Sequence, residues 1–139
     1  MYTYIHKSIR TYMQVQKYYT KRISSISNLS YKQRLQCLKL DSLELRRLYF
    51  DMRMVYKIIH GLIDVAFDDL FTFSPNRSTR VHVYKLYCSK SNLNVRSHLF
   101  SQRCIAACNS LSSDVVTSPS LSIFNSRLYN VNFEKFLTI

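Results

Sequence analysis

The chain has 139 residues, 47% of them hydrophobic, which is enough for one domain with a core and too little for two of ordinary size. Twenty Lys and Arg against eight Asp and Glu give a net charge of +12, which indicates an anionic partner: nucleic acid first, an acidic membrane or protein surface second. A single glycine excludes glycine-rich phosphate loops, and no apolar run is long enough for a membrane span or a signal peptide.

The first forty residues contain eight Lys and Arg and no acidic residue, with six tyrosines interleaved. Helical spacing predicts an amphipathic helix from Tyr2 to Ile26, with Tyr12 and Tyr19 on its apolar face. Cations beside aromatic rings suit single-stranded nucleic acid, because the phosphates are neutralised while the bases stack. If Tyr12 and Tyr19 instead belong to the core, Tyr18 and Tyr31 remain as the plausible stacking residues.

Two further helices are expected before residue 63. Ser30 can cap a short helix from Tyr31 to Leu38. The segment from Asp41 to Leu62 is the longest amphipathic pattern, and we expect the rest of the chain to be organised around it. Asp41 and Glu44 have the spacing of a capping box. Gly61, the only glycine, stands where a helix end requires a left-handed residue.

This long segment has two different faces. One is an apolar stripe that is expected to be buried, and it consists of Leu45, Leu48, Met52, Val55, Ile59 and Leu62. Arg46, Arg53 and Lys57 share a second face, about 100° round the helix. This face is either a nucleic-acid contact or an ordinary solvated basic surface.

The middle of the chain has a different composition. Asp64, Asp68 and Asp69 form the only acidic cluster, which we interpret as helix-start charges in a connecting loop, since no neutral ligand or glycine accompanies them as in a metal loop. The segment from Thr79 to Cys88 alternates in the manner of a β-strand, and Leu93–Val95 is its expected hairpin partner.

Two helices are predicted near the C-terminus. The first runs from Ser97 to Leu111, and the second begins with Ser118 as N-cap and Pro119 at the first helical position, with Phe124 turned inward. The tail, residues 131–139, has little periodicity and is expected to fray.

Few residues suggest catalysis or metal binding. Cys88, His98, Cys104 and Cys108 could be assembled into a zinc site, but their spacing does not fit paired ligand knuckles, so we interpret Cys104 and Cys108 as buried core thiols. The four histidines stand in separate segments, and no serine lies in a nucleophile elbow. We therefore predict no enzymatic activity, no catalytic or metal-binding residue, no cofactor and no small-molecule substrate.

The order of motifs resembles the region that follows the polymerase domain in reverse transcriptases of non-LTR retrotransposons, of the jockey and CR1 kind. The resemblance covers about residues 8–130. The resembling stretches are Val15–Ile23, Leu29–Leu35, Leu43–Leu62, Thr79-Arg80, Asn94–Arg96, Phe100–Arg103, Asn109-Ser110-Leu111, Ser118–Leu121, Phe124 and Arg127-Leu128.

Two departures from the family pattern stand out: Cys108 replaces a Trp, and Ser112 replaces a Pro. Loss of a buried Trp is expected to leave a cavity that costs a few kcal/mol, which suggests a decayed copy. The chain also lacks the Tyr/Phe-x-Asp-Asp motif and the upstream carboxylate that would hold the two Mg²⁺ ions of polymerisation. Because Met1 falls within the resembling sequence, we expect a fragment of a longer protein.

Together these observations predict a mainly α fold, a small helical domain with a minor β hairpin. Residues 1–139 form one domain: a basic helical part (1–62), a loop and hairpin (63–96), two C-terminal helices (97–130) and a tail (131–139). The resemblance implies a C-terminal accessory region of an RNA-directed DNA polymerase, which contacts RNA or DNA. Because the sequence shows neither a membrane span nor a signal peptide, we expect the chain in the cytoplasm or the nucleus. We expect charge neutralisation without base readout. The residues expected to contact nucleic acid are Lys17, Lys21, Arg22, Arg34, Arg46, Arg53 and Lys57. The alternative is a helical scaffolding or protein-interaction domain that packs against the polymerase thumb or against another protein.

Overall fold

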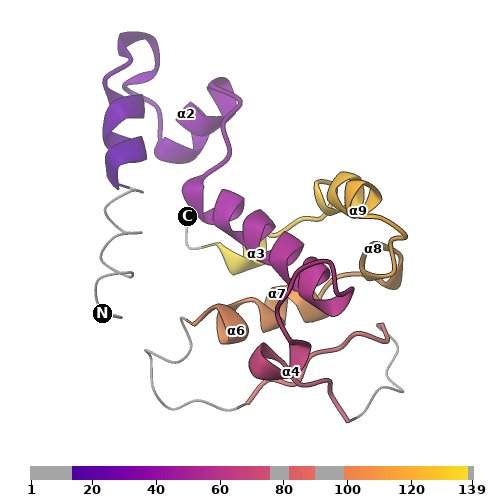
Figure 1. Cartoon of the computed structure of the whole chain (residues 1–139). Helices are drawn as coiled ribbons and strands as arrows, with labels where there is room; N and C mark the ends of the chain where they lie inside the picture. The colour runs from indigo at the N-terminus through magenta and orange to yellow at the C-terminus, as the bar shows by residue number, and fades with distance from the viewer. Residues whose placement is uncertain (1–13, 76–81, 90–98, 138–139) are drawn as a thin grey trace. The chain divides into compact units, whose positions relative to one another are not determined.

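A computed structural model describes residues 14–75, 82–89 and 99–137 (Figure 1). These residues divide into two compact units. Residues 14–47 and Leu137 belong to the first unit, and Leu48–Phe136 to the second. The described structure is mainly helical, as the sequence predicts. No helix within the described ranges has both the length and the apolar character that crossing a membrane requires.

The first unit contains short helices. Residues 14–21 are helical, followed by the 3-10 helix η1 (Ser24–Ile26) and by α2 (Tyr31–Cys37). The predicted helix over residues 2–26 therefore ends five residues early, and its part before residue 14 lies outside the described residues. The cap predicted at Ser30 is confirmed. Its side chain accepts a hydrogen bond from the Gln33 amide, while the Gln33 side chain accepts one from the Ser30 amide.

Helix α3 (Leu43–Ile59) is the longest described helix, and the boundary between the units falls inside it. The predicted cap at Asp41 is wrong by one residue, because the Ser42 hydroxyl accepts the hydrogen bond from the Leu45 amide. The predicted role of Gly61 is confirmed. Gly61 has φ +62°, and the amides of Gly61 and Leu62 donate to the carbonyls of Ile58 and Lys57, which is a Schellman motif.

The second unit forms a core around the second half of α3. Its other helices are α4 (Phe67–Leu70), α6 (Phe100–Arg103), α7 (Ile105–Asn109), α8 (Ser113–Val116), α9 (Leu121–Leu128) and the 3-10 helix η2 (Glu134–Phe136) (Figure 1). Met52 and Val55 of the predicted stripe are fully buried, while Leu48 and Ile59 are half-buried and Leu62 is exposed. Part of the apolar stripe of α3 is thus used in the core of the second unit.

The C-terminal elements differ from the sequence prediction in three places. The predicted helix over residues 97–111 is divided at Cys104 into α6 and α7, although Cys104, Ala107 and Cys108 are buried as expected. The last helix is capped by Ser120, since the hydroxyl of Ser118 is directed to the end of α8. The expected fraying of the tail is wrong for Phe133, which is buried in the core.

The described residues do not support the predicted β hairpin. Within residues 82–89 there is no strand, only an isolated antiparallel bridge between Leu86 and Phe73, and residues 79–81 and the expected partner Leu93–Val95 lie outside the described residues. The side chain of Asn109 explains the difference. Its Oδ1 accepts from the Leu86 amide and its Nδ2 donates to the Leu86 carbonyl, both at 2.8 Å. A side-chain amide therefore stands where a neighbouring strand would pair.

Candidate nucleic-acid interface

The exposed cations of the first unit lie on the helix of residues 14–21 and just beyond it. Lys17, Lys21 and Arg22 are all exposed. Within the described ranges none of the three forms an ion pair with a carboxylate, in keeping with the lack of any acidic residue before Asp41. The Lys17 ammonium lies 5.0 Å from the centre of the Tyr31 ring. These cations are therefore accessible to phosphate groups in water.

Arg34 has a different environment from the other predicted contacts. It is only 6% exposed, and it donates from Nε to the Thr20 hydroxyl at 3.2 Å and from Nη1 to the Leu29 carbonyl at 2.6 Å. A third, longer bond joins Nη2 to the Lys17 carbonyl at 3.4 Å. Arg34 thus connects α2 to the preceding loop and to the helix of residues 14–21. Its guanidinium is used inside the unit and is not presented at the surface.

Tyr31 is held by the same set of contacts. Its hydroxyl donates to Gln16 Oε1 at 2.6 Å, and the guanidinium carbon of Arg34 lies 5.8 Å from its ring centre. Burial, with a further contribution from Glu44, raises the pKa of Tyr31, while Arg34 and Arg46 act in the opposite direction. Tyr31 therefore stays a protonated hydrogen-bond donor at neutral pH, with Lys17 and Arg34 already placed over its ring.

The predicted cationic face of α3 is divided between the two units. Arg46 is exposed and belongs to the first. In the second, Arg53 donates from Nε to Asn125 Oδ1 at 2.9 Å and from Nη2 to the Tyr129 hydroxyl, and Lys57 is half-buried. Arg53 is therefore partly engaged with α9. The sequence interpretation omitted Phe50, which is 60% exposed, although the 100° rule places it near Arg53 and Lys57 on the helix.

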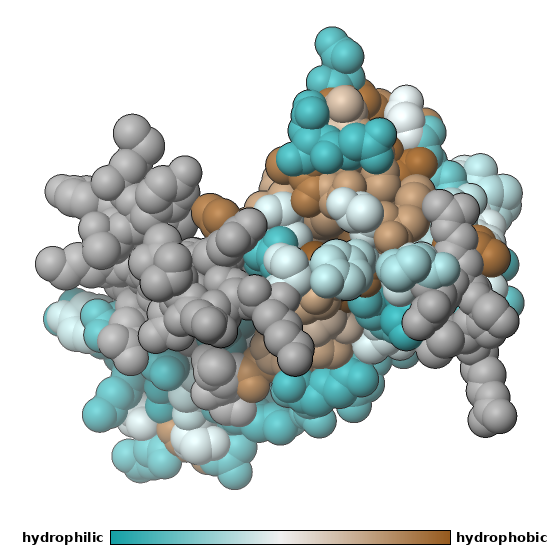
Figure 2. Space-filling view, turned by 90° about the horizontal axis from the view of Figure 1, so that it is seen from below, coloured by the Kyte–Doolittle hydropathy of each residue, from teal (hydrophilic) through white to brown (hydrophobic). Residues whose placement is uncertain are grey.

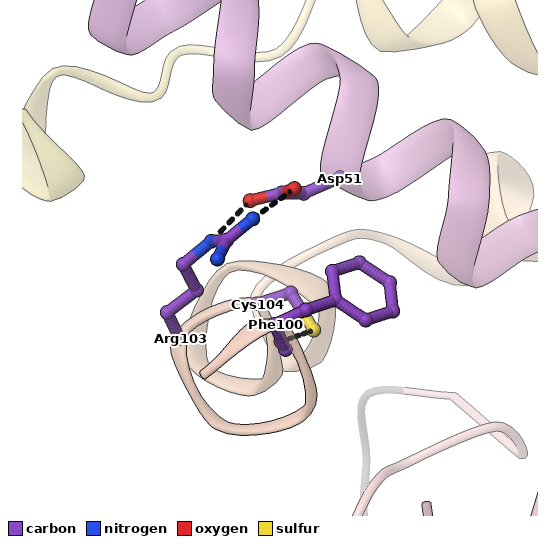
Figure 3. Close-up of polar contacts among 4 residues, drawn as sticks. All are labelled: Asp51, Phe100, Arg103 and Cys104. Carbon is purple, nitrogen blue, oxygen red and sulfur yellow. Dashed lines mark hydrogen bonds and ion pairs between the residues drawn. The ribbon is translucent and has the colours of Figure 1, made fainter. Parts of the chain in front are cut away.

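The buried ion pair of the second unit was not predicted. Arg103 of α6 points to Asp51 of α3 and holds both carboxylate oxygens (Figure 3). Beside it, the Cys104 thiol donates to the Phe100 carbonyl at 2.8 Å. Spacing alone gives no sign of this pair, because Asp51 and Arg103 are 52 residues apart.

The cysteines behave as buried or isolated thiols. Burial raises the pKa of Cys108 to about 12 and that of Cys104 further still, so neither is a ready thiolate ligand at neutral pH. Cys37 and Cys88 are exposed and unpaired. Within the described ranges, no three His, Cys, Asp or Glu side chains are grouped so that they could hold a metal ion. His6 and His98 lie outside those ranges, whereas His60 and His82 contact backbone carbonyls.

Comparison with known proteins found no match: no protein-family model, no curated protein and no solved structure is similar to this chain.

Proposed function

We propose that this chain is a helical accessory region of the kind that follows the polymerase domain in non-LTR retrotransposon reverse transcriptases, and that it binds RNA or DNA without catalytic residues of its own. The order of the resembling sequence blocks supports the first part of the proposal. The genomic sequence upstream of the gene tests it. A polymerase motif there, in frame or in broken frame, is expected. An independent promoter with no such motif would contradict the proposal.

The observation that carries the second part is the exposure of Lys17, Lys21 and Arg22, which form no ion pair with a carboxylate among the described residues. Residues 1–47 contain ten of the twenty basic residues and only two of the eight acidic ones, so the positive charge is concentrated in the first unit. Phosphates would be bound there through charge, with release of counterions and without base-specific contacts. Arg46 is a further exposed cation of this unit. Arg34 supports the interface from within, because it holds the Lys17 backbone.

Fluorescence anisotropy of the whole chain with duplex DNA and single-stranded RNA, between about 50 and 200 mM salt, tests this binding. Affinity is expected to fall steeply with salt. In Lys21→Ala/Arg22→Ala the slope of log K against log salt should decrease by about 1.5, since each phosphate contact contributes roughly 0.7 to 0.9.

The control is Lys85→Ala/Lys135→Ala, which removes the same charge from the second unit. It should leave the slope nearly unchanged. An equal decrease of the slope in both double variants would mean that nucleic acid is bound by the overall positive charge of the chain and not by the cations of the first unit. Absence of binding at low salt by a folded chain would contradict the proposed function altogether.

A second candidate function is protein interaction, and the exposed apolar side chains of the second unit favour it. Phe50, Leu62 and Val83 are each more than half exposed, and Figure 2 shows hydrophobic residues at the surface among hydrophilic ones on the face that it draws. A chain that packs against another domain through such residues is expected to self-associate when alone. Sedimentation of the native chain and of Phe50→Gln tests this. Monomeric behaviour of the native chain would count against the candidate.

A further inference from the structure

The two tyrosines described in the helix of residues 14–21 face water, contrary to the interpretation that places Tyr19 in the core, while Tyr12 lies outside the described residues. Tyr19, which was expected on the apolar face, is 64% exposed, and Tyr18 is 54% exposed. The residues that pack inward are polar: Thr20 is buried and Gln16 is half-buried. Thr20 accepts the hydrogen bond from Arg34, and Gln16 accepts the one from Tyr31. Because the inner face is occupied by this polar network, both aromatic rings remain on the outer face.

The exposed rings stand among the cations of the candidate interface. The geometry of 100° per residue places Lys21, Tyr18 and Arg22 within about 100° of one another around the helix axis. The guanidinium carbon of Arg22 lies 4.3 Å from the centre of the Tyr18 ring, and Arg22 also donates a hydrogen bond to the Tyr18 hydroxyl. The rings of Tyr18 and Tyr19 meet edge to face, with centres 5.8 Å apart.

Tyr31 is less accessible to a ligand than Tyr18 and Tyr19. Its hydroxyl is engaged with Gln16, and both Lys17 and Arg34 lie over its ring. A base that stacked on Tyr31 would have to displace Arg34, which is buried and holds other parts of the unit together. The cation over the Tyr18 ring is Arg22, which is exposed and can turn toward a phosphate. Of the tyrosines described in the first unit, Tyr18 and Tyr19 are therefore the ones with more than half of their surface open to a ligand.

We propose that this surface binds single-stranded nucleic acid, with bases stacked on Tyr18 and Tyr19 and phosphates held by Lys21 and Arg22. The proposal rests on the proposed function and adds the kind of strand that is bound. Aromatic rings give a sequence-tolerant stacking surface to unpaired bases. In a duplex the bases are already stacked on one another, so the tyrosines add little there and only the charges contribute.

Three oligonucleotides of the same length test the proposal: a single strand of about 12 nucleotides, its duplex with the complement, and an abasic strand with the same number of phosphates. The native chain is expected to bind the normal strand about tenfold more tightly than the abasic strand. Tyr18→Leu/Tyr19→Leu, which keeps good helix formers on the helix, should lose this difference and bind both strands alike. Its affinity for the duplex should change less than about twofold.

Tyr87→Leu is the matched control, because Tyr87 is also 53% exposed but lies in the second unit. It should bind all three oligonucleotides as the native chain does, and circular dichroism should show both variants folded. Equal binding of the normal and abasic strands by the native chain would overturn stacking while leaving the proposed function intact. If the native chain binds neither single strand nor duplex at low salt, both proposals fail.

Discussion

Arg103 holds Asp51 with two nearly parallel hydrogen bonds, from Nε to Oδ2 at 2.8 Å and from Nη2 to Oδ1 at 2.7 Å. The side chain of Asp51 is only 4% exposed, whereas that of Arg103 is 27% exposed. This bidentate geometry is the strong form of a charge-assisted contact, and it ties α6 to α3 inside the second unit.

Removal of Arg103 should destabilise the second unit, because it leaves a buried carboxylate without its partner. We expect Arg103→Met to lower the free energy of unfolding by about 3 kcal/mol. The double variant Asp51→Leu/Arg103→Met should cost less, since no charge then remains buried. Urea unfolding measures both. A single variant that is as stable as the native chain would show that Asp51 is solvated in solution.

Arg34→Met should destabilise the first unit by about 2 kcal/mol, because Thr20, Leu29 and Lys17 lose the donor that joins them. Amide hydrogen exchange over residues 14–37 is the direct measurement, since it reports on this unit alone. Arg46→Met is the control. Arg46 is exposed, so its substitution should change exchange in this segment by less than about 0.5 kcal/mol.

The thiols should react in two groups. At about pH 8, an alkylating reagent is expected to modify Cys37 and Cys88, which are exposed, and to spare Cys104 and Cys108. Burial protects the latter twice, since it blocks access and raises their pKa. Mass spectrometry of tryptic peptides gives the site of labelling. Denaturant should make all four react, and rapid labelling of Cys108 in the native chain would contradict the core described above.

Acid should weaken the second unit through His82. This side chain is 5% exposed; its Nε2 lies 3.3 Å from the Cys108 carbonyl, and Nδ1 has no partner among the described residues. Burial lowers the pKa of His82; the Cys108 hydrogen bond opposes this in part, and the nearby Lys85 adds a smaller lowering. The unfolded chain therefore binds the proton more readily, and stability should fall as the pH drops below about 6.5.

The urea midpoint at about pH 7 and about pH 5.5 measures this effect. His82→Gln should reduce the difference between the two midpoints, whereas His60→Gln serves as the comparison because His60 is only half-buried. An unchanged difference in His82→Gln would show that other groups cause the acid sensitivity.

The predictions from sequence succeeded where one residue determines a local conformation. Gly61 ends α3 because glycine adopts positive φ without strain, and Ser30 begins α2 because its hydroxyl replaces a missing acceptor. They failed where the conformation of a segment depends on a side chain that is distant in the sequence. The alternation at residues 82–88 favours a strand, but Asn109 satisfies the backbone of Leu86 instead. Propensity carries no information about such a partner.

The candidate interface was predictable in its charge and not in its details. Lys17, Lys21 and Arg22 are exposed, and the basic segment without an acidic residue before Asp41 already indicated them in the sequence. The burial of Arg34 and the exposure of Tyr19 have one cause: the helix of residues 14–21 packs inward through Thr20 and Gln16, which are polar. Periodicity assigns apolar residues to the inner face, so it cannot identify a face that is buried through hydrogen bonds.

The substitution Cys108→Trp tests whether the core still has room for the residue that the resembling family carries. Cys108 borders a void of only about 10 Å³, which it shares with Val55, Leu111 and Phe124. That is space for about one water molecule and far less than an indole needs. The surrounding side chains thus fill most of the volume that the loss of a Trp was expected to leave.

Overpacking should make Cys108→Trp less stable than the native chain by about 2 kcal/mol or more in urea unfolding. Cys108→Ala, which enlarges the void slightly, is the matched control with a cost of about 1 kcal/mol. A gain in stability on introducing Trp would instead show that the native packing retains the larger site.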